Sequence, residues 1–228
     1  WFFWTLNWLA SYQTETELVG PTGKCEKTIR DRLWRTVSLI QGLKEKKIVW
    51  PDSWSDPTVD TPVFIATVDC THCPIYEPLV GHKYSKNPKY YSHKMERAGL
   101  SYEAAIDIWT SRVVWFHGPY PAGTGDPDIF EDRLMSKVPA GKKVIADNVY
   151  RRAALPMISL TNYNDSVKVK LFKRRARARQ ESLFAKMKSF DVLTKNFRHG
   201  VSKHKVCAEA VAVLCQYMIE DVPLFNVL

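Results

Sequence analysis

The stretch Val63-Phe-Ile-Ala-Thr-Val-Asp69 decides the fold expected for this chain. Its aromatic and β-branched residues favour a buried strand, and an acidic residue ends the run. A second, shorter run, Lys143-Val-Ile-Ala146, is likewise followed by an acid, Asp147. The two acids lie far apart in the sequence, so their relation depends on how the strands are ordered.

The segment between these two runs predicts that order. Strands are expected at Ser101–Trp109 and at 112–117, and three successive strands without an intervening helix favour antiparallel pairing. A turn at 118–125 precedes a helix over 126–137, capped by Asp126 or Asp128, and then the fourth strand. This order predicts an α/β fold with a ribonuclease-H-like mixed sheet flanked by helices. In that fold the first and fourth strands are neighbours, so Asp69 and Asp147 should converge.

Three regions are predicted along the chain. Residues 1–46 form a small helical segment, in which Ile29, Leu33, Val37 and Ile40 make one apolar stripe. Its spacing fits a helix-turn-helix, and it equally fits a helical pair packed on the main domain. Residues 47–62 are a Pro- and Trp-rich linker, and 63–228 form the main domain. The apolar opening at residues 1–10 is about half the ~20 residues that a membrane span needs, and we expect the chain to be a fragment of a longer one.

Charge is concentrated in one segment of the 228 residues. The chain carries a formal net charge of +9, yet residues 166–205 alone carry +11 and the remainder −2. Such a focused field attracts polyanions, although a charge run is also often a solvated face or a localisation signal. Five cysteines do not predict a disulfide framework, and Cys70 and Cys73 lack the second pair that a structural zinc site needs. Buried side chains beside the first strand are the simpler interpretation of these two.

A third acid, Glu181, lies within the basic segment. Residues from Arg174 to about Leu193 favour a helix, and the spacing of Arg177, Glu181 and Lys188 places these three on one face. An Arg–Glu pair at this spacing is ordinarily a surface salt bridge of about 0.3–0.5 kcal/mol. Together with Asp69 and Asp147, however, Glu181 supplies the carboxylates that bind divalent cations in phosphoryl-transfer sites.

The chain resembles the transposases of the Harbinger superfamily over roughly residues 60–228. The first matching block is Val68-Asp-Cys-Thr-His-Cys-Pro-Ile75, followed by Tyr91-Ser-His-Lys94 with Gly99 and Tyr102. The second is Gly118-Pro-Tyr-Pro-Ala-Gly-Thr-Gly-Asp-Pro-Asp-Ile-Phe130, and the third is Ile145-Ala-Asp-Asn-Val-Tyr150. The separation between Asp147 and Glu181 is close to the family's usual one. Val149 replaces a usual Gly, and Arg174 replaces a frequent Tyr.

The resemblance implies a DDE-type endonuclease that cuts DNA and then joins strands by two-metal-ion phosphoryl transfer. It makes Asp69, Asp147 and Glu181 the catalytic ligands of Mg²⁺ or Mn²⁺, with Asp126 as an accessory metal ligand or helix cap. Which of Asp126 and Asp147 is the second catalytic acid stays open, and topology favours Asp147. The residues expected to contact the DNA backbone are Lys168, Lys170, Lys173, Arg174, Arg175, Arg177, Arg179 and Lys188.

The same resemblance implies a nuclear protein that acts on element ends and target DNA, with a Myb-like DNA-binding partner protein and a homo-oligomeric assembly. Two alternatives remain at this stage. A domesticated, catalytically silent derivative would act as a DNA-binding or nuclear adaptor protein. The intact acids Asp69, Asp147 and Glu181 count against this alternative, whereas Val149 leaves it open. A basic nucleic-acid-binding module without enzymatic ancestry would leave the three acids far apart.

Overall fold

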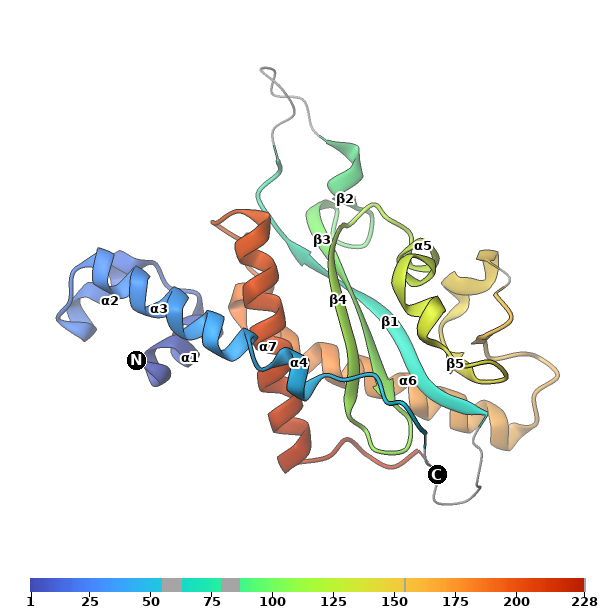
Figure 1. Cartoon of the computed structure of the whole chain (residues 1–228). Helices are drawn as coiled ribbons and strands as arrows, with labels where there is room; N and C mark the ends of the chain where they lie inside the picture. The colour runs from blue at the N-terminus through green and yellow to red at the C-terminus, as the bar shows by residue number, and fades with distance from the viewer. Residues whose placement is uncertain (55–62, 79–86, 154, 228) are drawn as a thin grey trace.

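The chain folds around a six-stranded mixed sheet with helices on both faces (Figure 1). The structure is a computed structural model that describes residues 1–54, 63–78, 87–153 and 155–227. Within these residues the strands are β1 (Phe64–Pro74), β2 (Tyr91–Ser92), β3 (Arg97–Asp107), β4 (Val113–Pro121), β5 (Lys143–Ile145) and β6 (Ile158–Ser159).

The strand order confirms the ribonuclease-H-like topology predicted from the sequence. β3 pairs antiparallel with β1 along one edge and with β4 and the short β2 along the other. β1 then pairs parallel with β5, and β5 pairs parallel with β6. The first and fourth long runs of the sequence are therefore neighbours in space. A parallel neighbour brings the carboxyl ends of both strands to the same edge.

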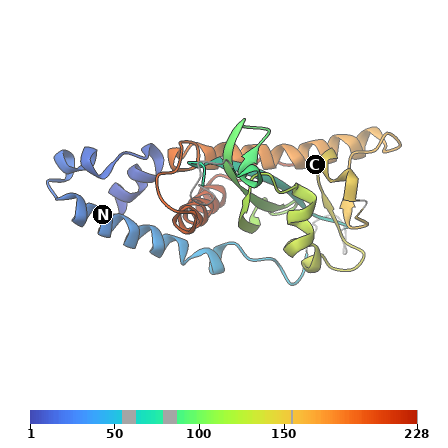
Figure 2. The same cartoon turned by 90° about the horizontal axis from the view of Figure 1, so that it is seen from above.

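Helices cover both faces of this sheet. The principal ones in the described residues are α1 (Phe2–Ser11), α2 (Glu15–Thr22), α3 (Glu26–Gln41), α4 (Lys44–Lys47), α5 (Asp126–Ile129), α6 (Val167–Lys188) and α7 (Val201–Asp221). A short π-helix (Phe130–Leu134) and a 3₁₀-helix (Met135–Lys137) follow α5, and further 3₁₀-helices lie at Pro88–Tyr90, Asn148–Ala153 and Asp191–Leu193. Viewed from above, α6 runs along one side of the sheet and α5 lies on the other (Figure 2). In the described part of the chain, no helix combines the length and apolar character that crossing a membrane requires.

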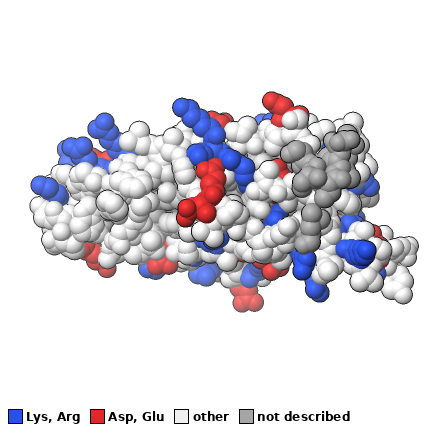
Figure 3. All heavy atoms as spheres, turned by 90° about the horizontal axis from the view of Figure 1, so that it is seen from below, with Lys and Arg blue, Asp and Glu red and all other residues white. Residues whose placement is uncertain are grey.

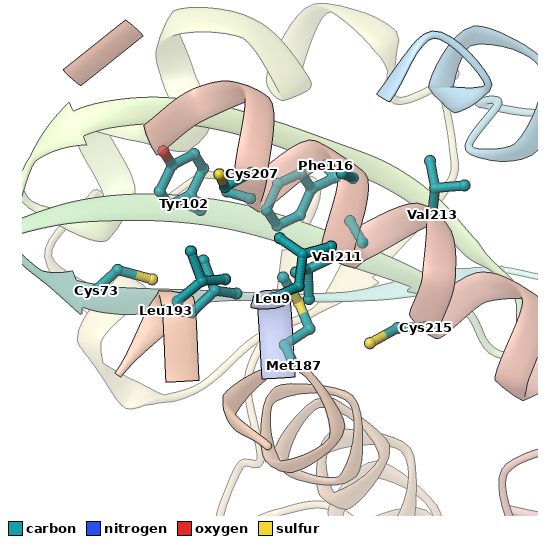
Figure 4. Packing of buried hydrophobic residues seen from close by; sticks show 14 of the residues in the cluster. Leu9, Cys73, Tyr102, Phe116, Met187, Leu193, Cys207, Val211, Val213 and Cys215 are labelled. Carbon is teal, nitrogen blue, oxygen red and sulfur yellow. The ribbon is translucent and has the colours of Figure 1, made fainter. Parts of the chain in front are cut away.

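Alternating residues of β1 and β3 divide between the two faces. Cys73 and Tyr102 face α6 and α7, where they pack with Met187 and Val211 in one buried cluster (Figure 4). Val68 and Ala105 face α5 and pack with Phe130 and Tyr150 in another. Successive residues of a strand point to opposite faces of the sheet, and here both faces are covered. Apolar residues are therefore needed at nearly every position, which explains the almost continuous apolar runs in the sequence of these strands.

The N-terminal helices share a core with the sheet domain. The stripe on α3, predicted from the spacing of its apolar residues, is buried: Ile29, Leu33 and Val37 are at most 1% exposed. α3 packs on α1, α2 and α7, so the stripe is used to join this segment to the main domain. A capping box at Thr14 and Glu17 starts α2, and Gly23 ends it with a φ of +63°. The boundary at residue 46 remains a prediction.

The linker predicted at 47–62 is described only up to residue 54. Trp50 and Trp54 pack edge to face with ring centroids 5.0 Å apart, and Trp50 donates its indole N–H to the Lys137 carbonyl at 3.0 Å. The chain thus passes from α4 to the α5 face of the sheet. The prolines at 57 and 62 lie outside the described residues.

Several element ends differ from the predicted ones. β1 continues to Pro74 because its residues from Ala66 onward pair with Gly99–Asp107 of β3. β3 begins at Arg97 because its first two residues pair with β2. α6 begins at Val167, where Ser166 accepts a hydrogen bond from the Val169 amide, and ends at Lys188. Each shift lengthens or shortens an element whose type was predicted correctly.

Candidate active site

Asp69 and Asp147 lie side by side because of the register between β1 and β5. Thr67 is the partner of Ile145 across this parallel pair, and each aspartate lies two residues further along its strand. Asp69 accepts a hydrogen bond from the Cys70 amide at 2.8 Å. Asp147 accepts a hydrogen bond from the Val149 amide at 2.8 Å, at the start of the 3₁₀-helix Asn148–Ala153. Asp69, within β1, therefore lies beside Asp147, which follows the end of β5.

The turn after Asp147 does not need the glycine that usually follows there in the resembling family. Val149 is not among the non-glycine residues with a positive φ in the described chain, which are Tyr12, Glu96 and Ser111. The backbone continues into a tight helical turn, which Val can adopt. The substitution thus leaves the placement of Asp147 intact.

Asp126 joins these two acids from the opposite side of β1. It is the first residue of α5, and the neighbouring thiol of Cys70 lowers the pKa of its carboxyl group. Burial, together with the negative charges of Asp126 and Asp147, raises the pKa of Asp69 to about 6, although the hydrogen bond from the Cys70 amide lowers it. Burial and the charge of Asp147 also raise the pKa of Asp126. The negative charges of these carboxylates thus act on one another.

Glu181 reaches the same region from α6. A cavity of about 280 Å³ is lined by Asp69, Asp147 and Glu181. Arg177 and Lys188 line it as well, as their spacing with Glu181 predicted. Within the ranges that the structure describes, no three His, Cys, Asp or Glu side chains stand close enough to hold one metal ion. The fold therefore places the acids around one cavity, but their side chains are not close enough together to bind a single ion.

Gln180 fixes α6 over the sheet at this cavity. Its side-chain amide donates to the carbonyls of Thr67 at 3.2 Å and Ala104 at 2.8 Å, although it is only 2% exposed. The Oε1 atom of Gln180 and the hydroxyl of Thr71 are buried at the cavity and have no hydrogen-bond partner among the described residues. Buried polar atoms of this kind ordinarily find a partner, and here a bound molecule would supply it.

The donor set fits a hard divalent cation. The acidic side chains at the cavity offer only oxygen, which Mg²⁺ and Mn²⁺ prefer over nitrogen or sulfur. A cation would also offset the repulsion that raises the pKa of Asp69. Cys70 and Cys73 are buried strand residues, and the thiol of Cys70 is engaged by Asp126.

The basic residues of α6 differ in exposure. Arg174, Arg175, Lys168 and Lys188 are exposed. Lys170 and Arg177 are half-buried and line, with Arg174, a second cavity of about 510 Å³. Arg177 lines both cavities, so these cations lead along α6 toward the acids.

Lys173 and Arg179 correct the sequence prediction, because both are buried. Lys173 is 4% exposed, and its amine donates to the Leu160 carbonyl at 2.8 Å and to Asp165 at 2.9 Å. Arg179 is 3% exposed, and its guanidinium donates to the carbonyls of Ile108 and Phe225. Their donors satisfy the protein's own acceptors, so neither presents its charge to DNA.

Lys94 is a cavity residue that the sequence alone did not assign a role. It belongs to the matching block Tyr91-Ser-His-Lys94, yet its position gave no sign that it would face the acids. In the structure it lines the acidic cavity and its charge lowers the pKa of Asp69 and Asp126. Only the folding of the β2–β3 hairpin brings it there.

The surface on the lower side of the molecule carries small groups of basic and acidic side chains separated by uncharged areas (Figure 3). A surface that binds a nucleic-acid backbone needs a continuous basic track. This side is therefore not a candidate for that contact. The cavities along α6 offer the better one.

Comparison with known proteins gives a family and a weak structural likeness. The family model described as "DDE superfamily endonuclease" matches residues 68–216, well over half of the chain. No curated protein matches significantly. A solved structure described as "Mos1 transposase paired-end complex with left transposon end" has a TM-score of 0.33 and 12% identity, covering 92% of this chain and 71% of that chain. The "Mos1 Strand Transfer Complex" has a TM-score of 0.29 and 11% identity, covering 94% and 75%. Structural likeness at this level carries no argument about function.

Proposed function

Because the chain belongs to the DDE superfamily endonucleases, we propose that it cuts DNA phosphodiester bonds by metal-dependent phosphoryl transfer. Asp69, Asp147 and Glu181 are the proposed catalytic acids. The observation that supports this most directly is the β1–β5 register, which sets Asp69 beside Asp147 at a cavity whose wall carries Glu181. Residues separated by most of the domain in sequence thereby face one space.

Mg²⁺ or Mn²⁺ would be held by oxygens of Asp69, Asp147 and Glu181, with Asp126 as a further ligand. Such ions lower the pKa of a nucleophile and neutralise charge on the leaving oxygen when bound. Asp69 must lose its proton before it can serve as a ligand, and burial beside two acids delays that loss to a pKa of about 6. Gln180 holds α6, and therefore Glu181, at a fixed height above β1 through its two bonds to strand carbonyls.

The DNA backbone is proposed to follow α6. Lys170, Arg174 and Arg177 line one cavity, and Arg177 and Lys188 line the acidic one, so cations flank Glu181 on both sides along the helix. The twelve residues from Arg177 to Lys188 span about 16 Å, which is a helix face long enough for several phosphates. Phosphate contacts position the strand without reading its sequence.

Finer assignments rest on the resemblance to Harbinger transposases. They are action on element ends and target DNA, strand joining, residence in the nucleus, a Myb-like partner protein and homo-oligomeric assembly. Arg32 and Arg35, exposed on α3, are the proposed place for sequence-specific contacts, since the apolar stripe of that helix is buried and Arg30 is paired with Glu15. Purification of the chain with an element end would test this group of proposals.

One observation favours a second candidate function, a DNA-binding or adaptor protein that has lost cutting activity. No three metal-binding side chains in the described residues converge, and Glu181 is exposed. This candidate keeps the basic cavities of α6 but gives the acids no catalytic role.

Nicking of supercoiled plasmid DNA in Mg²⁺ or Mn²⁺ separates the two candidates. Asp69→Asn, Asp147→Asn and Glu181→Gln should each lower nicking by on the order of 100-fold or more, because metal-assisted charge stabilisation is worth several kcal/mol. DNA binding should persist in each variant. Asp128→Asn is a matched control, since Asp128 is exposed and close to Asp126 in sequence. Wild-type protein that binds DNA but never nicks it would favour the adaptor function over the endonuclease function.

A further inference from the structure

A short hairpin places one lysine over the acidic cavity. β2 ends at Ser92, β3 begins at Arg97, and the turn between them carries Lys94. Lys94 is exposed and lines the cavity together with Asp69, Asp147 and Glu181. It is the cavity's cation that does not come from α6. The cavity is thus bordered by basic groups from two separate elements.

The hairpin turn is fixed to the sheet rather than free. The Ser92 hydroxyl and Nδ1 of His72 on β1 lie 2.6 Å apart, and the Met95 amide donates to the Ser92 carbonyl at 3.2 Å. Gly99 on β3 lets Met95 pack closely: a Cβ there would stand 2.5 Å from the Met95 methyl and 2.9 Å from the Cys73 carbonyl. These contacts hold the residues on both sides of Lys94.

Lys94 and Lys188 both line the cavity. Burial, together with the charges of these two lysines, lowers the pKa of His72 on β1 to about 4. Within the described residues, no hydrogen bond or ion pair joins the Lys94 amine to a partner. A cation held near acids without pairing to them is available to a bound anion.

The polar atoms of the cavity point to the same kind of ligand. The Thr71 hydroxyl and Gln180 Oε1 are buried there without partners among the described residues. The hydroxyl can donate to an anionic oxygen, and the amide oxygen can accept from a water or a hydroxyl of a bound molecule. An apolar ligand would leave both unsatisfied.

We propose that Lys94 binds a phosphate of the DNA strand in the cavity that Arg177 and Lys188 of α6 also line. The strand is then held by the β2–β3 hairpin as well as by α6. This inference rests on the proposed function, because it assigns a contact for the DNA that the acids would cut. The ligand class is the phosphodiester backbone, without sequence preference.

The proposal is tested by binding to a short mixed-sequence duplex in Ca²⁺, or in EDTA, where binding is measured without cutting. Lys94→Ala should weaken binding roughly tenfold and lower the slope of log affinity against log salt by about 0.9, the value for one lost phosphate contact. Lys94→Arg should restore both, since the guanidinium keeps the charge. Lys89→Ala is the matched control: Lys89 is exposed on the turn that precedes β2 but does not line the cavity.

Lysine acetylation provides a second readout on the unmutated chain. A saturating amount of the same duplex should protect Lys94 and Lys188 from acetylation by an N-hydroxysuccinimide ester and leave Lys89 reactive. Equal salt slopes for Lys94→Ala and Lys89→Ala, or no protection of Lys94, would overturn the proposal.

The outcomes also separate this proposal from the proposed function. Wild-type protein that binds the duplex with the expected Lys94 effect but never nicks plasmid DNA would remove cutting and keep the phosphate contact. Wild-type protein that nicks DNA through Asp69 and Glu181, with Lys94→Ala unaffected in binding, would remove only the contact. Absence of salt-dependent binding by the wild type would remove both.

Discussion

Glu103 should make the chain less stable as the pH rises through the neutral range. It lies on β3 between Cys70 of β1 and His117 of β4, and it is fully buried. Its Oε2 accepts a hydrogen bond from the Trp115 indole at 2.7 Å, whereas its Oε1 has no partner among the described residues. Burial, and then the charges of Asp126 and Asp132, raise its pKa to about 8 in spite of the Trp115 bond.

The sign and size of the effect follow from this pKa. Unfolded Glu103 releases its proton near its ordinary value of 4.5, whereas the folded chain keeps the proton up to about 8. Between these values the folded state binds more protons, so the free energy of unfolding falls as pH rises. Each pH unit in this window costs about 1.4 kcal/mol, which amounts to about 4 kcal/mol near pH 7.5. The effect is absent below the unfolded pKa.

Urea denaturation of wild type and Glu103→Gln in EDTA measures this difference. Gln keeps the shape and accepts the Trp115 bond without a charge, so the variant should be more stable than wild type near pH 7.5 by roughly 2–4 kcal/mol. Near pH 5 the two should be similar. Glu131→Gln, an exposed control, should track the wild type at both values. A variant destabilised equally at both pH values would refute the reasoning, because it would show that the Glu103 carboxylate is ionised and favourably paired.

Three further predictions concern the core, the basic helix and the acids. Leu33→Ala on α3 should lower the free energy of unfolding by about 2–5 kcal/mol because Leu33 is 1% exposed. Leu39, on the same helix, is 66% exposed, so Leu39→Ala should change that free energy by less than about 0.5 kcal/mol. Similar losses for the two variants in urea denaturation would contradict the packing of α3 on α7. Arg179→Ala should lower the free energy of unfolding by about 1–3 kcal/mol because it leaves the carbonyls of Ile108 and Phe225 unpaired. Arg174→Ala should weaken duplex binding and leave the unfolding curve unchanged. An Arg179→Ala variant as stable as the wild type would show that these two hydrogen bonds do not stabilise the fold. Mn²⁺ affinity, measured by calorimetry, should weaken as the pH falls below about 6, because the ion must then displace a proton from Asp69. An affinity that stays constant across this pH range would exclude Asp69 as a ligand.

The predicted strands show how far local pattern carries. The apolar run before Asp69 and the shorter run before Asp147 were each identified as strands, because burial on both faces demands apolar residues at successive positions. The extension of β1 through Cys70-Thr-His-Cys-Pro74 was missed. Those residues have weaker strand preference, and they are extended because β3 pairs with them.

The basic helix shows where pattern stops. Helical spacing correctly grouped Arg177, Glu181 and Lys188 on one face. It did not show that Lys173 and Arg179 would be buried, since a spacing defines which residues share a face and not what lies opposite that face. Their carbonyl partners belong to segments distant in sequence, such as Ile108 and Phe225.

The sequence by itself determined the kinds of element, their order and the two aspartates that follow apolar runs, because these follow from local preference and from periodic burial. Tertiary structure decided the rest: the pairing of Thr67 with Ile145 set Asp69 beside Asp147, and the β2–β3 hairpin carried Lys94 to the cavity. Both depend on strand register and packing between distant segments. A one-residue shift in the register of β1 would turn the side chain of Asp69 to the opposite face of the sheet. The free energy that prevents such a shift comes from packing of the whole core.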